Sequence, residues 1–123
     1  MLSQNQKRQL NFSLGQRGEA KAAKFLTNKN YQILDINIRI KNNEVDIIAL
    51  DKSYDEVVFI EVKTRNTDFY GNPSSAVNNK KIASMNMVAC AYLRDKRLQK
   101  DYRFDIITVT PAGVEHFENI SWL

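Results

Sequence analysis

The amino-acid sequence predicts a single α/β domain in which helices flank a mixed central β-sheet. Three observations predict this fold class. A helical pattern of apolar residues near the start of the chain is followed by three short stretches rich in Val, Ile and Phe. A longer helical pattern then separates these stretches from one or two further strand-like stretches. The length of 123 residues suits one hydrophobic core and leaves little room for a second.

The first predicted helix begins at Ser13, after a polar and unpatterned stretch over residues 1–12 that we expect to be a flexible N-terminal segment. Ser13 and Gln16 have the spacing of a capping box, in which two side chains satisfy free amides of the first turn. One face of this helix carries Leu14, Gly18, Ala22, Phe25 and Leu26. Because Gly18 and Ala22 are small, the helix can lie close against a sheet. The predicted domain covers residues 13–123.

Three strands are predicted after this helix. Over residues 31–40, apolar residues at every second position are typical of a strand with one buried face. Those residues are Leu34, Ile36, Ile38 and Ile40. A second strand is expected over residues 45–50 and a third over residues 57–64, with a polar turn over residues 51–55 between them. The third stretch is apolar on both faces, which predicts a central strand.

The second predicted helix covers residues 75–96, after a loop over residues 67–75. Its apolar stripe consists of Ile82, Met85, Ala89 and Tyr92. Residues 104–109 then form a predicted central strand, and residues 114–122 a final one. The order of helix, three strands, helix and one or two strands completes the α/β assignment.

The scarcity of cysteine and histidine restricts the chemistry that this chain can perform. The single cysteine, Cys90, excludes an internal disulfide and a thiolate metal cluster, and its apolar neighbours predict a small buried residue. The single histidine, His116, argues against a histidine-based zinc site and against a Ser-His-Asp triad. The remaining means of catalysis are carboxylates, lysines, hydroxyls and a metal ion held by oxygen ligands.

The distribution of charged and apolar residues predicts a soluble, cytoplasmic protein with no membrane partner. No apolar run follows the basic residues at the start, which argues against a signal peptide, and no apolar span is long enough to cross a bilayer. The formal net charge of +4 permits a phosphate-rich partner such as a nucleic acid but does not require one.

Charged residues interrupt the most apolar stretch of the chain. Glu61 and Lys63 lie two residues apart in the third predicted strand and therefore share a face. Pairing of this strand with the second as a hairpin would bring Asp46 and Glu61 side by side. Two carboxylates and a backbone carbonyl, for which we consider Val62, are hard oxygen ligands suited to Mg²⁺ or Mn²⁺. The alternative is a structural Glu61–Lys63 ion pair with Asp46 at a strand end, and the spacing alone does not decide between the two.

Longer stretches around these residues resemble a known family. Residues 43–49 (NEVDIIA) and 59–65 (FIEVKTR) are similar to the YraN-type family, a group of small, largely uncharacterised bacterial proteins in the PD-(D/E)XK nuclease superfamily. The resemblance extends over most of the chain. Its further matches are residues 15–20, Tyr70, Gly71, Pro73, residues 103–105 and Trp122.

The resemblance implies a restriction-endonuclease-like core with a defined division of catalytic roles. Asp46 and Glu61 would hold a divalent metal ion, and Lys63 would act as the catalytic lysine of the superfamily. Glu19 matches an accessory acidic position that completes the site in related resolvases. From the sequence alone, Glu19 is a first-turn carboxylate that the helix dipole stabilises.

Two positions depart from the family pattern. Asn43 replaces a glycine that often precedes the Glu-Val-Asp segment, although asparagine can still adopt the turn conformation. Ile82 replaces a glutamine that many relatives carry after a basic residue, so that a polar contact to the site is missing. The departure at Ile82 bears on how active the enzyme is and leaves the expected fold unchanged.

Three functions are compatible with these features. The first is a Mg²⁺- or Mn²⁺-dependent endonuclease acting on DNA, including branched or damaged structures as for resolvase-like relatives, with Arg65, Lys80 and Lys81 as phosphate contacts. Alternatively, these cations are solvent-exposed side chains with no role in binding. The second function is a nucleic-acid-binding module that keeps the nuclease fold with weak or no catalysis. DNA is favoured over RNA in both cases, and a homodimer is left open. The third is an interaction protein in which the Glu61–Lys63 pair is structural.

Overall fold

A computed structural model describes residues 17–66 and 78–120 of the chain. The described elements are a helix over residues 17–28, β1 (Tyr31–Ile40), β2 (Asn43–Asp51), β3 (Glu56–Thr64), α2 (Asn79–Asp95), β4 (Tyr102–Thr110) and β5 (Gly113–Phe117). Several predictions concern residues outside the described ranges. These are the segment 1–12, the capping box of Ser13 and Gln16, the loop residues Tyr70, Gly71 and Pro73, and Trp122.

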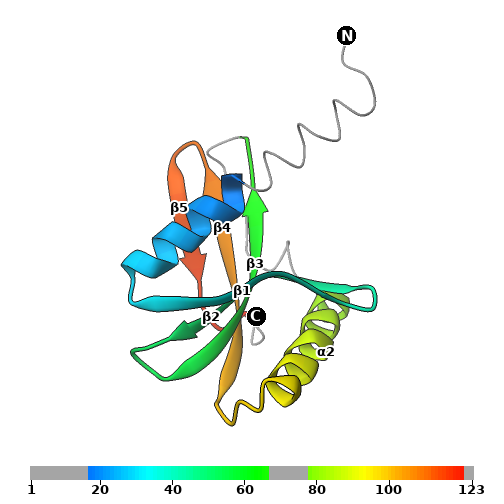
Figure 1. Ribbon diagram of the computed structural model, residues 1–123. Helices are drawn as coiled ribbons and strands as arrows, with labels where there is room; N and C mark the ends of the chain where they lie inside the picture. The colour runs from blue at the N-terminus through cyan, green and yellow to red at the C-terminus, as the bar shows by residue number, and fades with distance from the viewer. Residues whose placement is uncertain (1–16, 67–77, 121–123) are drawn as a thin grey trace.

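The five strands form one sheet in the order β1-β2-β3-β4-β5 (Figure 1). Neighbouring strands are antiparallel, except that β3 and β4 run parallel. Parallel neighbours need a crossover connection, and α2 lies in the segment between these two strands. The predicted mixed sheet flanked by helices is therefore confirmed, and the arrangement is consistent with a restriction-endonuclease-like core.

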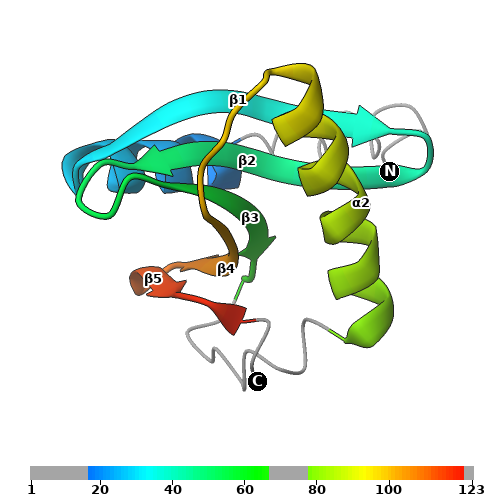
Figure 2. The ribbon, with the colours of Figure 1, turned by 90° about the horizontal axis from the view of Figure 1, so that it is seen from below.

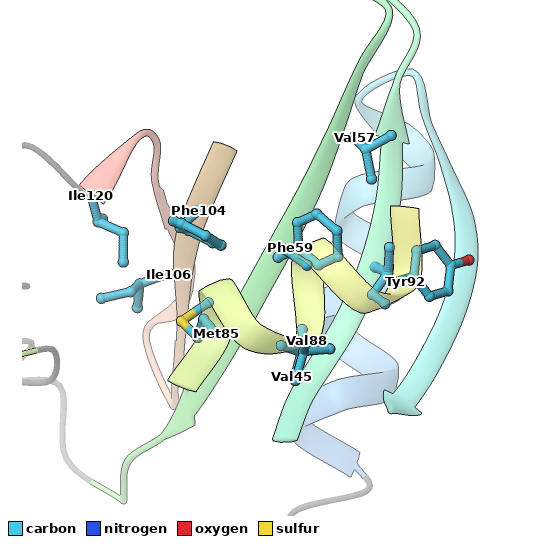
Figure 3. Close-up of a cluster of buried hydrophobic side chains, with 11 residues drawn as sticks. Val45, Val57, Phe59, Met85, Val88, Tyr92, Phe104, Ile106 and Ile120 are labelled. Carbon is cyan, nitrogen blue, oxygen red and sulfur yellow. The ribbon is translucent and has the colours of Figure 1, made fainter. Parts of the chain in front are cut away.

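The two helices cover different faces of the sheet (Figures 1 and 2). Helix α2 lies over β1 and β2, and its side chains pack in one cluster with side chains of β2, β3 and β4 on the face that we call the α2 face. Figure 3 shows Met85, Val88 and Tyr92 of this helix grouped with Phe59 and Phe104. The cluster on the other face, the N-terminal-helix face, consists of Ala22, Leu26, Tyr31, Ile47, Ala49, Val58, Ile60, Ile107 and Val109. Neither described helix is long and apolar enough to span a lipid bilayer.

The apolar patterns located the central elements correctly. Strand β3 is buried on both faces, as its continuous apolar run predicts. In α2 the buried residues follow the expected stripe, and Asn78 caps the helix by accepting a hydrogen bond from the Lys81 amide at 2.8 Å. Strand β2 extends beyond its predicted ends, so that Asp51, which we expected in the turn, is a buried strand residue.

The alternation predicted for β1 is wrong at its centre. The register with β2 shifts between Ile33 and Asp35, and Asn37 adopts a left-handed conformation with φ of 51°. Because such irregularities change which side chains face the core, Leu34 and Ile38 pack on the α2 face while Ile36 is 54% exposed. Period-two patterns assume an unbroken strand, which β1 is not.

Two further predictions need correction near the surface. Strand β5 ends at Phe117 because Asn119 takes a left-handed conformation, with φ of 55°, and its amide donates to the carboxylate of Asp105. The chain therefore leaves strand geometry before residue 122. Cys90 is exposed rather than buried, since Ala89 and Tyr92 occupy the core side of α2.

Candidate active site

Glu61 and Lys63 lie near the carboxyl end of β3, on the α2 face of the sheet. The alternation of side chains along β3 places both on the side of Phe59, as predicted. Lys63 Nζ lies 3.2 Å from Glu61 Oε1, and Lys81 of α2 places its Nζ 3.1 Å from Oε2. The Glu61 side chain is only 9% exposed. Two lysines from separate elements therefore compensate the charge of a largely buried carboxylate.

Asp46 lies where β2 separates from β3. The antiparallel register of the two strands ends at the pair Ile47–Ile60, and its continuation would place Asp46 opposite Glu61. At this point Asp46 Oδ2 accepts a hydrogen bond from the backbone amide of Val62, at 2.7 Å. The predicted hairpin is confirmed, and the side chain of Asp46 is fixed beside the segment that carries Glu61.

The surroundings of Asp46 oppose its negative charge. Its pKa is raised to about 7, first because burial disfavours the charged form and second because Glu61 is also negative. The hydrogen bond from the Val62 amide acts in the opposite direction, and Glu19 adds a smaller increase. A cation placed beside Asp46 and Glu61 would favour the charged form of both carboxylates.

The N-terminal helix brings Glu19 toward the same end of the sheet. Gly18 packs against Thr64 at the end of β3, and a Cβ atom at residue 18 would overlap the Thr64 hydroxyl. This close approach needs glycine and sets the position of the next residue, Glu19. Burial raises the pKa of Glu19, a hydrogen bond with Asn37 lowers it, and the charge of Glu61 raises it further. Glu19, Asp46 and Glu61 therefore act on one another electrostatically.

The oxygen atoms at this position suit a hard divalent cation. Mg²⁺ is commonly held by one or two carboxylates and keeps several of its water ligands. Asp46 and Glu61 provide two carboxylates, and the carbonyl of Val62 stays the third predicted ligand. Within residues 17–66 and 78–120, no three or more Asp, Glu, His or Cys side chains are grouped so that they could enclose an ion. A cation would therefore bind through few protein ligands, and Glu61 would exchange a lysine for it.

A threonine that the sequence analysis did not identify lies beside Lys63. The parallel register of β3 and β4 pairs Lys63 with Thr108, so that their side chains point to the same face. Thr108 is 6% exposed, and its Oγ1 has no hydrogen-bond partner among the residues that the structure describes. Buried hydroxyl groups seldom lack a partner, so the Thr108 hydroxyl is an unsatisfied polar group beside the candidate site. Its position depends on the strand register, for which the sequence carries no signal.

The three predicted phosphate contacts occupy different positions. Lys81 is paired with Glu61, whereas the adjacent Lys80 is exposed at the start of α2. Arg65 follows β3, where its amide donates to the carbonyl of Val109 at 2.8 Å and its side chain is exposed. Ile82, which stands where many relatives carry glutamine, packs against the hydrophobic cluster on the α2 face.

A second group of buried charges lies on the N-terminal-helix face and was missed by the sequence analysis. Arg103 of β4 is 9% exposed, and its guanidinium group donates to three carboxylates and one hydroxyl. The donor–acceptor distances are 3.0 Å to Asp105, 3.1 Å to Asp51, 2.7 Å to Glu56 and 2.7 Å to the Tyr31 hydroxyl. We call these five residues, together with His116, the Arg103 network. The spacing of Arg103 and Asp105, two residues apart in a strand, is the signal that could have revealed it.

His116 joins the Arg103 network through Asp105. Its Nε2 lies 2.7 Å from Asp105 Oδ2, and its Nδ1 lies 3.1 Å from Lys29 Nζ. Burial raises the pKa of Asp105, but hydrogen bonds from His116, Arg103 and the Asn119 amide outweigh this effect and lower the pKa overall. The single histidine of the chain therefore helps to satisfy a buried carboxylate.

The fold and the site together define a class of protein. The chain has a restriction-endonuclease-like α/β core, with an aspartate and a Glu-x-Lys pair at the end of two neighbouring strands. More particularly, it belongs to the uncharacterised protein family UPF0102, whose model matches residues 18–109. This is the YraN-type family, a member of the PD-(D/E)XK-like nuclease superfamily.

Relatives from distant bacteria match nearly the whole chain. A UPF0102 protein of Alkaliphilus oremlandii is 41% identical over 117 residues, which cover 89% of this chain and 98% of the relative. One from Geobacter metallireducens is 38% identical over 114 residues, covering 89% and 92% of the two chains. One from Thermotoga maritima is 39% identical over 105 residues, covering 85% and 93%. These proteins carry the family name alone, so they support the family and not an activity.

Proposed function

We propose that this protein is a metal-dependent nuclease that hydrolyses phosphodiester bonds in DNA, with branched or damaged DNA as its substrate class. The observation that carries the proposal is the placement of Asp46 beside Glu61, where the pKa of Asp46 is raised to about 7. Within the described part of the chain, no cation forms an ion pair with Asp46. Carboxylates whose charge is left uncompensated at a strand end are typical of a site that binds a cation.

Each residue of the site has a chemical task in this proposal. Asp46, Glu61 and the carbonyl of Val62 would hold Mg²⁺ or Mn²⁺, which supplies Lewis acidity and a water of lowered pKa when bound. Lys63 would donate from Nζ to a non-bridging phosphate oxygen and so stabilise the negative charge that develops there. Glu19 would accept a hydrogen bond from the attacking water and orient it.

Two further groups would contact the substrate on the α2 face. Lys81, released from Glu61, would compensate charge on the phosphate, and the Thr108 hydroxyl would find in a phosphate oxygen the partner that it lacks. Simultaneous cleavage of both strands of a branched DNA would require two such sites, which a homodimer would provide. Phosphate contacts of this kind predict binding that weakens steeply with salt.

A second candidate function is a nucleic-acid-binding module with the nuclease fold and little or no catalysis. Both oxygens of Glu61 are paired with lysines, and the side chain of Ile82 contributes no polar contact. If the lysines hold Glu61 too tightly for a metal ion to replace them, the cationic surface would still bind DNA. This alternative predicts salt-sensitive binding without cleavage under any divalent metal.

The cleavage experiment separates the two candidates. Wild-type protein would be incubated with linear, mismatched and four-way-junction DNA in Mg²⁺, in Mn²⁺ and in a chelator. We expect cleavage with either metal, no cleavage in the chelator, and none by Glu61→Gln or Lys63→Met. The matched control is Asp95→Asn, because Asp95 is an exposed carboxylate at the far end of α2. Binding without cleavage in all conditions would favour the binding module and reject the nuclease.

Metal binding is measured separately by calorimetric titration of Mn²⁺. We expect the wild type and Asp95→Asn to bind one ion with similar affinity and Asp46→Asn to bind at least about tenfold more weakly. Unchanged binding by Asp46→Asn would rule out this site. Loss of stability in Glu61→Gln, with neither metal nor DNA binding by the wild type, would instead support an interaction protein with a structural ion pair.

A further inference from the structure

A hollow of about 320 Å³ lies where the N-terminal helix meets the carboxyl ends of the parallel strands β3 and β4. Figure 1 shows the first described turn of this helix beside the end of β3. The described lining residues are Arg17, Gly18, Lys21, Thr64, Arg65, Asn66, Thr110 and Pro111. In α/β proteins, ligands commonly bind at the carboxyl ends of parallel strands.

The positive charge of this hollow is concentrated and uncompensated. Arg17 and Lys21 lie four residues apart, on one face of the helix, and Arg65 reaches the hollow from the end of β3. No carboxylate is among the described residues that line it. Over residues 17–66 and 78–120, none of these three cations forms an ion pair with an acidic side chain. Three cations at close range repel one another, and an anion between them would remove the repulsion.

Several contacts fix the walls of the hollow. The absence of a side chain at Gly18 lets the helix touch Thr64, so that the helical cations lie close to the strand ends. The amide of Arg65 donates to the carbonyl of Val109 at 2.8 Å, which holds this residue beside β4. These contacts pack the backbone of the walls into the domain. Thr64 and Asn66 add polar groups that can bind phosphate oxygens.

We propose that this hollow is a phosphate-binding subsite, which holds a backbone phosphate of the bound DNA other than the one that is cleaved. That the ligand is DNA rests on the proposed function. Gly18 and Thr64 in the wall are the sequence neighbours of Glu19 and Lys63, so the subsite lies at the same end of the sheet as the candidate active site, on the side of the N-terminal helix. Arginine can bind phosphate through two parallel hydrogen bonds, and the guanidinium groups of Arg17 and Arg65 are suited to this contact.

DNA binding in the presence of a chelator tests the subsite without any need for catalysis. The affinity for a short fluorescent duplex would be measured by anisotropy over a series of salt concentrations for the wild type and Lys21→Gln/Arg65→Gln. The matched control is Lys24→Gln/Lys52→Gln, which removes the same charge from exposed positions outside the hollow. We expect the first variant to bind at least about tenfold more weakly, and the slope of log affinity against log salt to decrease by about 1.

Inorganic phosphate provides a second probe. Amide resonances of Thr64, Arg65 and Asn66 should shift on titration with phosphate in the wild type and in the control variant, but not in Lys21→Gln/Arg65→Gln. Equal DNA affinities and salt slopes for the two double variants would overturn the inference. Phosphate shifts without a difference in DNA binding would also overturn it, because the hollow would then bind a small anion and not a strand.

The outcomes keep this inference separate from the proposed nuclease activity. If Asp46→Asn still binds Mn²⁺ and no DNA is cut, but the subsite variant loses DNA affinity, the subsite stands and the nuclease fails. If DNA is cut in a metal-dependent manner but both double variants bind and cut alike, the nuclease stands and the subsite fails.

Discussion

Two strand aspartates, Asp105 and Asp46, have opposite electrostatic surroundings within one sheet. Asp105 is completely buried, yet hydrogen bonds from His116, Arg103 and an amide outweigh the effect of burial and lower its pKa. Asp46 is less deeply buried, but it has a single amide donor and a carboxylate neighbour, and its pKa is raised to about 7. Depth of burial therefore does not determine the direction in which the pKa of a carboxylate shifts.

The balance of hydrogen-bond donors and neighbouring charges determines this direction. In the Arg103 network, each buried carboxylate has a cationic or hydrogen-bonding partner from the protein itself. At the candidate active site, Lys63 and Lys81 both pair with Glu61. Asp46 instead experiences the repulsion of the neighbouring Glu61 carboxylate. The charges of the Arg103 network are therefore compensated by residues of the protein itself. The charges of the candidate active site are not, so that an added cation would stabilise it.

The largest effect on stability is expected from removing the cation of the Arg103 network. Arg103→Met would leave Asp51 and Asp105 buried without their cation, and we expect the free energy of unfolding to fall by about 3–5 kcal/mol. Urea denaturation at pH 7 measures this change. Arg39→Met is the control, because Arg39 forms an exposed pair with Glu44 that should contribute at most about 1 kcal/mol. Similar losses in both variants would contradict a special role of the Arg103 network.

Neutralising Asp105 tests the same group through its pH dependence. The pKa of Asp105 is lowered from its ordinary value of 3.8, so its charged form stabilises the fold above that pH, and the stabilisation is lost as the pH falls toward the folded-state pKa. Asp105→Asn should therefore reduce the free energy of unfolding by about 2–3 kcal/mol at pH 7 and by less at pH 3. A loss that is independent of pH would show that charge is not the cause.

The same change, aspartate to asparagine, should have the opposite effect on the free energy of unfolding when it is made at Asp46. Because the pKa of Asp46 is raised from 3.8 to about 7, its ionisation destabilises the fold progressively between about pH 4 and pH 7, and the full cost is present above pH 7. In metal-free buffer, Asp46→Asn should raise the free energy of unfolding by about 1–2 kcal/mol at pH 8 and by little at pH 4. A destabilised variant at pH 8 would contradict the unbalanced charge inferred for this site.

The smallest effect concerns the cation that a metal ion would replace. Lys81 Nζ lies 3.1 Å from Glu61 Oε2, where it competes with a metal ion for the carboxylate. Lys81→Gln should therefore bind Mn²⁺ about three- to tenfold more tightly than the wild type in calorimetry. Lys80→Gln is the matched control, since the adjacent Lys80 is exposed. An equal increase in Mn²⁺ affinity in both variants would show that the lower overall positive charge is the cause, and not the release of Glu61.

Local patterns in the sequence predicted the parts of the site that depend on one strand. The alternation of side chains placed Glu61 and Lys63 on one face, and the short turn between two apolar stretches predicted the hairpin that brings Asp46 near them. Both results follow from strand geometry and need no knowledge of distant contacts.

The parts that were missed depend on contacts between distant residues. The ion pair of Lys81 with Glu61, twenty residues earlier in the chain, depends on how α2 packs and was not predicted. The Arg103 network joins residues of all five strands, among them Tyr31, Asp51 and His116. The irregularity of β1 likewise comes from its pairing with β2. Periodicity does not encode how helices and strands meet, so these features required the structure.

The central claim is that Asp46 and Glu61 form a site for a divalent cation. Carboxyl-carbon NMR of Asp46, followed over pH with and without Mg²⁺, tests it most directly. Without Mg²⁺ we predict a titration midpoint near 7, and with saturating Mg²⁺ a midpoint lower by about one pH unit or more, while Asp105 is unaffected. A midpoint for Asp46 near 4 that does not respond to Mg²⁺ would contradict the claim.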